Sequence, residues 1–127
     1  SLIPNGIPSI EERIKLLYTE GVLLGKISLE TFVAVASTNA AKVFGLYPKK
    51  GEIAVGSDAD IVVFDPNSTS TISAKTHHMA TDYSAFEGRR VSGQIRDVTV
   101  RGRFVVRSGA LVVGEGGGRY LARPCTH

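Results

Sequence analysis

Cysteine and tryptophan are scarce in this sequence, and long apolar runs are missing. Its 127 residues include one cysteine, Cys125, and no tryptophan. A single cysteine cannot build a disulfide framework within one chain, so we expect a reducing, cytoplasmic setting. The longest apolar runs fall far short of the roughly 20 residues that a membrane-spanning helix needs. We therefore expect no membrane contact.

Excess charge is also small. The net charge is +3, with 15 basic and 12 acidic residues, and the basic ones include a late group of arginines: Arg89, Arg90, Arg96, Arg101, Arg103 and Arg107. No aromatic stacking pattern or known docking motif accompanies these arginines, which argues against a nucleic-acid partner. A solvated face or a subunit contact is the favoured interpretation. The apolar fraction of 43% predicts a folded domain, or part of a larger one.

Residues 9–45 predict a small helical group. Ser9 and the glutamate three residues later have the spacing of a capping box, which opens a first helix. Apolar residues at helical spacing then lead to Gly21 as the expected stop. A second helix is expected from Ser28, and Thr38 is expected to cap a third short helix.

Beyond the helical group the apolar period changes to 2, which predicts strands. The stretch GEIAVGSDADIVVFD predicts a strand over Glu52–Val55, a turn, and a strand over Ile61–Phe64. Pro66 is expected to close the second strand, because proline cannot continue a central strand. Later, Ile95–Val100 and Arg103–Val106 predict a hairpin around an Arg-Gly turn.

Few residues suggest chemistry by themselves. Asp58 and Asp60 would share one face of a strand at roughly 7 Å. That spacing could serve acid–base work or a metal, but no histidine or third carboxylate adjoins them, so turn and strand contacts are favoured. His77 and His78 are neighbours without an H-x-H spacing, and catalytic zinc normally takes three protein ligands, which favours structural roles. The residues alone contain no complete active site.

Five stretches resemble a known family. GEIAVGSDADIVVFD resembles the strand pair near the C-terminus of the amidohydrolase superfamily, and VTVRGRFVVRSGAL resembles the hairpin found shortly after that pair. Three others narrow the resemblance to the dihydropyrimidinase and D-hydantoinase group, which includes the collapsin response mediator proteins: IPNGIPSIEERIKLLYTEGV, VASTNAAKVFGLYPKKG and TISAKTHHMATDYSAFEG. The stretches are collinear and cover nearly the whole chain.

The resemblance implies an α+β fragment. Residues 1–45 would be the C-terminal helices of a (β/α)8 amidohydrolase barrel with a substrate loop, residues 46–113 most of a small β-sandwich, and residues 114–127 a glycine-rich tail. Asn5 matches the asparagine whose backbone carbonyl accepts a hydrogen bond from the substrate ring, and Gly6 would let that loop approach closely.

The implied activity is the reversible opening of dihydropyrimidine or hydantoin rings to N-carbamoyl amino acids. In the family two zinc ions activate a bridging hydroxide, since a bound metal lowers the pKa of water. The family's metal motifs are not found in this sequence. We therefore expect no catalytic residue and no metal ligand in this chain, no bound zinc, and no activity from the chain alone.

The expected partners are the missing N-terminal portion of the same protein, a homo-oligomer and a small cyclic amide. Unpaired sheet edges would promote such association. Two alternatives stay open: a non-catalytic scaffold like the collapsin response mediators, and a freestanding β-rich assembly module.

Overall fold

The chain divides into two compact units in a computed structural model that describes residues 6–114 and 116–122. The first unit combines Ser1–Ser28 with Asp65–Gln94, and the second combines Leu29–Phe64 with Ile95–His127. Each unit therefore joins a helical segment to a strand-rich segment distant in sequence. Within the described residues, none of the helices has the length and apolar character needed to cross a membrane.

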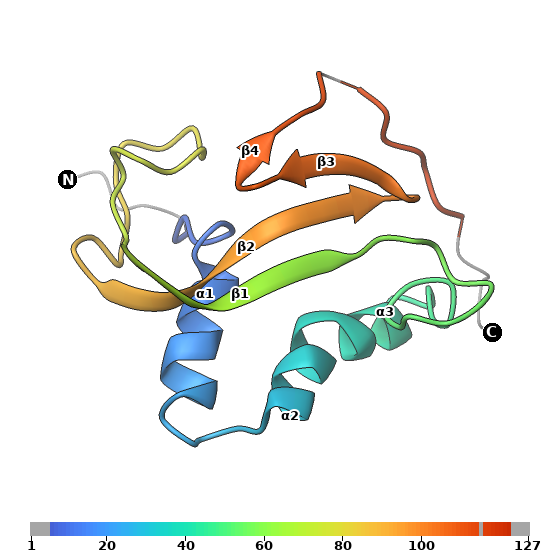
Figure 1. Ribbon diagram of the computed structural model, residues 1–127, viewed down its shortest axis with the longest axis horizontal. Helices are drawn as coiled ribbons and strands as arrows, with labels where there is room; N and C mark the ends of the chain where they lie inside the picture. Colours follow the sequence, from blue (N-terminus) through green and yellow to red (C-terminus); the bar gives the residue numbers. More distant parts are fainter. Residues whose placement is uncertain (1–5, 115, 123–127) are drawn as a thin grey trace. The chain divides into compact units, whose positions relative to one another are not determined.

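The helices are short and are extended by π-helical turns. Helix α1 (Arg13–Leu17) continues into the turn Tyr18–Val22, and helix α2 (Leu29–Val33) continues through the turn Ala34–Thr38 into helix α3 (Asn39–Val43). Figure 1 shows the labelled helices in blue and teal. Gly45, with φ of +67°, follows α3, and glycine accepts the left-handed conformation of a helix end.

Four strands form one sheet in the order β1 (Val62–Thr71), β2 (Arg90–Val100), β3 (Arg103–Arg107) and β4 (Ala110–Leu111). Strands β2 and β3 pair antiparallel, with Val98 opposite Val106, and the register shifts after Val98. This hairpin confirms the sequence prediction around the Arg-Gly turn. Strand β4 pairs antiparallel with β3, with Leu111 opposite Val106.

The core of the first unit lies between its helical segment and the strands. Tyr18, Ile72 and Val91 are buried, Val91 almost completely. The Thr19 hydroxyl links helix and strand: its oxygen accepts the Ser92 N–H at 2.9 Å, and its O–H donates to the Lys15 carbonyl at 2.8 Å. The contact joins the end of the first helical segment to β2.

The core of the second unit contains Phe32 and Ala41, both buried on the helical segment. The Phe32 ring lies 6.0 Å from the Phe64 ring, centroid to centroid, in a tilted arrangement. A Cβ added to Gly51 would lie only 2.6 Å from the Ala41 Cβ. The chain after α3 therefore folds back closely onto that helix.

Three expectations about the helices are wrong. Helix α1 begins without a side-chain capping hydrogen bond, so the box at Ser9 does not form. Gly21 lies inside the helical segment, where a Cβ would meet the Ile27 side chain at 2.9 Å, so its small size serves packing. Thr38 does not cap a separate helix, because its hydroxyl donates to the Gly51 carbonyl at 2.6 Å.

Two expectations about the strands are also wrong. Glu52–Val55 does not form a strand, and Ile53 and Val55 are 84% and 108% exposed. Strand β1 continues through Pro66 to Thr71. It lies at one end of the strand order, and proline is tolerated in edge strands because one side of such a strand has no neighbour to pair with.

Candidate functional site

The expected substrate loop is described from Gly6 onward, and Asn5 lies outside the described residues. Gly6 is exposed and sits in a bend. Its carbonyl oxygen accepts a hydrogen bond from the Tyr83 hydroxyl at 3.2 Å. Within the first unit, the loop is therefore attached to the connection between β1 and β2.

That connection, residues 72–89, is closed at its base. The Ile72 N–H donates to the Arg89 carbonyl and the Gly88 N–H donates to the Ile72 carbonyl, both at 2.9 Å. Glu87 accepts the Ala74 N–H and the Ser73 hydroxyl, each at 2.7 Å. These two hydrogen bonds hold the pKa of Glu87 below its ordinary value. Hydrogen bonds thus hold the two ends of this connection together, although it contains no strand. We call the connection the frame.

A hydrogen-bonded contact joins this frame to the residues just before helix α1. Glu11 accepts the His78 N–H at 2.6 Å, and its other oxygen lies 3.1 Å from the His78 Nδ1. Burial would raise the pKa of Glu11, but the hydrogen bonds and charge of His78 outweigh it, so the pKa lies below its ordinary value. Glu11 therefore favours its ionised form beside His78.

A buried pair lies next to that contact. Glu12 and His77 are almost fully buried, with 3.8 Å between Glu12 Oε1 and His77 Nδ1. His77 Nε2 lies 2.8 Å from the Thr81 carbonyl, which only accepts, so Nε2 carries a proton. The Ser84 hydroxyl donates to Glu12 Oε1 at 3.5 Å. Glu12 Oε2 and His77 Nδ1 are buried and have no hydrogen-bond partner among the described residues. An unpaired buried polar atom is energetically costly.

The two aspartates of the GSDAD turn bind one lysine. Lys50 Nζ lies 2.8 Å from Asp58 Oδ2 and also contacts Asp60 Oδ2. Asp60 accepts the Arg101 N–H at 2.7 Å with its other oxygen. Burial opposes ionisation of Asp60, but Lys50 and Arg101 outweigh it and hold its pKa below the ordinary value. These contacts agree with a structural role for both aspartates.

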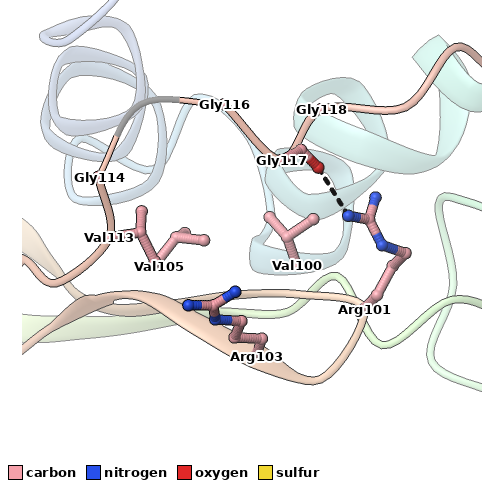
Figure 2. A pocket seen from close by; sticks show the side chains of 9 residues that line it. All are labelled: Val100, Arg101, Arg103, Val105, Val113, Gly114, Gly116, Gly117 and Gly118. Atoms are coloured by element: carbon pink, nitrogen blue, oxygen red, sulfur yellow. Dashed lines mark hydrogen bonds between the residues drawn. The ribbon is translucent and has the colours of Figure 1, made fainter.

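A hollow of about 370 Å³ lies within the second unit, as Figure 2 shows. Val100, Val105 and Val113 supply apolar side chains, and Arg101 and Arg103 supply cations. The Arg101 guanidinium donates to the Gly117 carbonyl at 2.7 Å, which attaches the glycine-rich segment to the hairpin. Gly116 and Gly117 have positive φ, as expected for a tightly turning segment.

The described residues contain no group of three or more His, Cys, Asp or Glu side chains that could hold a metal ion. The donor set in this part of the chain therefore does not fit the two zinc ions that the resemblance implies. Cys125 lies outside the described residues. The late arginines have intramolecular partners at several positions, including Arg89 with Glu20 and Arg96 with Asp97.

Sequence reasoning missed the contacts of Glu11, Glu12 and Tyr83. Glu12 was expected to cap a helix, and it faces His77 instead. Tyr83 is 77 residues from Gly6, so no local pattern connects them. The available signal was that two neighbouring carboxylates and two neighbouring imidazoles can form hydrogen bonds with each other.

Comparisons with known proteins agree with one another. The sequence profile of the Amidohydrolase family matches residues 5–105. The chain is 54% identical over 121 residues to a D-hydantoinase of Geobacillus stearothermophilus and 51% identical over 121 residues to a dihydropyrimidinase of Rattus norvegicus. Each alignment covers 95% of this chain, and 26% and 23% of those relatives.

Solved structures are similar over the same extent. A D-hydantoinase from a Bacillus species, AR9, has a TM-score of 0.92 at 55% identity, covering 95% of this chain and 26% of that one. An L-hydantoinase from Arthrobacter aurescens has a TM-score of 0.81 at 37% identity, covering 86% of this chain and 24% of that one. The chain thus spans about a quarter of the length of the relatives it matches.

Proposed function

Because this chain belongs to the amidohydrolase family, we propose that it is the C-terminal part of a hydrolase that opens cyclic amides. The substrate class is dihydropyrimidines or hydantoins, and the products are N-carbamoyl amino acids. The observation that carries this proposal is the identity of 54% and 51% to a D-hydantoinase and a dihydropyrimidinase over 95% of the chain. Because these relatives have enzyme names, the hydrolase is favoured over the non-catalytic scaffold.

The proposal assigns different tasks to different parts of the protein. Residues 1–45 would complete the barrel and its substrate loop, residues 46–113 would form most of a β-sandwich, and residues 114–127 the tail. Since the described residues do not fit a metal site, the ligands of the two zinc ions are assigned to the rest of the protein. Zinc would supply an activated hydroxide there, and no step of that chemistry is assigned to this chain.

What this chain would contribute is substrate binding. The backbone carbonyl of Asn5 would accept a hydrogen bond from a ring N–H, and Gly6 would allow close approach because it has no side chain. The support within the described residues is the hydrogen bond that the Tyr83 hydroxyl donates to the carbonyl of Gly6. In the whole protein, the remaining N-terminal portion and further copies of the chain would be its partners.

Ring opening tests the proposal. The full-length protein that carries this chain should convert dihydrouracil or hydantoin to the N-carbamoyl product when zinc is supplied, as followed by chromatography. The 127-residue chain alone should not do so under the same conditions. Lack of turnover by the full-length protein on both rings, or turnover by the chain alone at the full-length rate, would overturn the proposal.

A further inference from the structure

The buried pair of Glu12 and His77 lies inside the first unit and has no part in the proposed function. Glu12 comes just before helix α1, and His77 belongs to the frame, so the pair joins two segments that are distant in sequence. The two side chains are only 4% and 5% exposed. This chain itself encloses Glu12 Oε2 and His77 Nδ1, so the rest of the whole protein cannot reach these two atoms. The group that satisfies them therefore lies within the pair.

The geometry of the pair lacks a hydrogen-bond donor. His77 Nε2 donates its proton to the Thr81 carbonyl at 2.8 Å, so Nδ1 of a neutral ring can only accept. An ionised Glu12 carboxylate also only accepts, and its Oε1 lies 3.8 Å from Nδ1. The Ser84 hydroxyl reaches Oε1 only at 3.5 Å, which makes a weak hydrogen bond. Two buried acceptors thus face each other, an arrangement that costs free energy.

One proton removes this conflict. On Nδ1 it gives an imidazolium that donates to the carboxylate of Glu12, and on Glu12 it gives a carboxylic acid that donates to Nδ1 of His77. Both arrangements hold the same number of protons, so the pair and not either residue alone is the site. A proton also needs no room beyond that of the two side chains.

The charges around the pair favour a bound proton. Five titratable groups lie on the segments that carry the pair: Glu11, Lys15, Lys75, His78 and Glu87. Glu11 and Glu87 each accept a backbone N–H, which favours their ionised form. Their negative charges attract a proton to the pair, and the two lysines offset part of that attraction.

We propose that Glu12 and His77 form a proton-binding site that holds the frame against the segment before helix α1. When the frame opens, His77 meets water, where a histidine loses its ring proton near about pH 6.5. Above that pH the closed frame therefore binds one more proton than the open frame. By linkage, this proton stabilises the closed frame fully at low pH, and the stabilisation is lost as the pH rises. The inference goes beyond the proposed function, because it involves no substrate.

The isosteric variants Glu12→Gln and Glu11→Gln test this in the full-length protein by hydrogen–deuterium exchange. After correction for intrinsic exchange rates, protection of the amides of residues 72–89 in wild type should fall about tenfold between about pH 6.5 and about pH 8.5. In Glu12→Gln, the new amide N–H replaces the proton as donor to His77 Nδ1, so protection should stay constant. Glu11→Gln changes the neighbouring, more exposed carboxylate and should behave as wild type.

Three outcomes of the exchange experiment would overturn the inference. Constant protection in wild type would show that no proton is linked to closure of the frame. An equal fall in Glu12→Gln would assign the linked proton to another group. A fall that disappears in Glu11→Gln would assign it to the exposed contact between Glu11 and His78.

The His77 ring gives a second readout that does not depend on opening of the frame. Its NMR signals in the full-length protein are identified by their loss in His77→Gln. In wild type these signals should shift as the pair releases its proton above about pH 6.5, and in Glu12→Gln they should stay constant over the same range. A wild-type ring without such a shift would mean that a bridging water satisfies the pair, and the inference would be wrong.

Discussion

At the residue scale, the backbone at Gly51 has a φ of +88° and runs against helix α3. An added Cβ would lie 2.6 Å from the Ala41 Cβ and 3.1 Å from the Thr38 Cα. Neither neighbour can rotate away, because one atom is a Cβ and the other is backbone. The nearby hydrogen bond from the Thr38 hydroxyl to the Gly51 carbonyl holds the two segments together.

Gly51→Ala should therefore destabilise the chain by about 3 kcal/mol, since it combines left-handed strain with overpacking. Gly56→Ala is the matched control, because Gly56 has a φ of +97° and no atom within 4 Å of an added Cβ. It should cost about 1 kcal/mol, from backbone strain alone. The free energy of unfolding in urea measures both. Equal losses in the two variants would show that the clash contributes nothing.

Single residues also show where sequence reasoning succeeds. The late Arg-Gly turn was predictable because the sequence places a glycine between two strand-like runs. Gly102 has a φ of +77°, which glycine adopts readily, and the two adjacent strands pair with each other. The Tyr83 contact to Gly6 was not predictable, because it joins residues 77 positions apart through a backbone carbonyl that carries no sequence signal. The loop itself was identified only through a family resemblance.

At the scale of the elements, the apolar pattern misplaced one helix end and one strand because it does not show which side chains pack together. Gly21 resembles a helix stop, but its lack of a side chain provides space for Ile27, and the segment ends later. Glu52–Val55 is short and mostly apolar, which predicted a strand, but a strand also needs a neighbour to pair with, and its Ile53 and Val55 side chains are exposed. A short apolar run therefore does not predict a buried strand when the strand it would pair with is unknown.

One hydroxyl forms a hydrogen-bonded link between the first helical segment and β2. Thr19→Val keeps the shape of the side chain but leaves the Ser92 N–H without its acceptor at 2.9 Å. We expect a loss of about 1–2 kcal/mol in the free energy of unfolding, the cost of an unsatisfied, part-buried donor. Faster amide exchange at Ser92 should accompany it.

Thr19→Ser is the control, because it keeps the oxygen that accepts from Ser92 and removes only a methyl group. It should retain slow exchange at Ser92 and lose less stability than Thr19→Val. If the serine variant loses as much as the valine variant, the methyl group and not the hydrogen bond carries the effect.

At the scale of the whole molecule, the described surface includes many large apolar side chains. Ile10, Val43, Ile53 and Val55 are each more than three-quarters exposed. Strand β1, ten residues long, lies at one end of the strand order. The chain spans about a quarter of the length of its relatives, and under the proposed function the rest of the hydrolase would cover such surfaces. Without that cover, exposed edges and apolar patches promote association.

We therefore expect the purified 127-residue chain to associate at micromolar concentration, with a mass by light scattering above the 13.5 kDa of one chain. Val62→Lys places a charge on β1 at an exposed position and should shift the mass toward 13.5 kDa, because lysine blocks edge pairing. Tyr120→Lys is the control, since it removes an exposed apolar side chain outside the strands. A monomeric wild-type chain would contradict the prediction. An equal shift in both variants would assign the association to general apolar exposure and not to the strand edge.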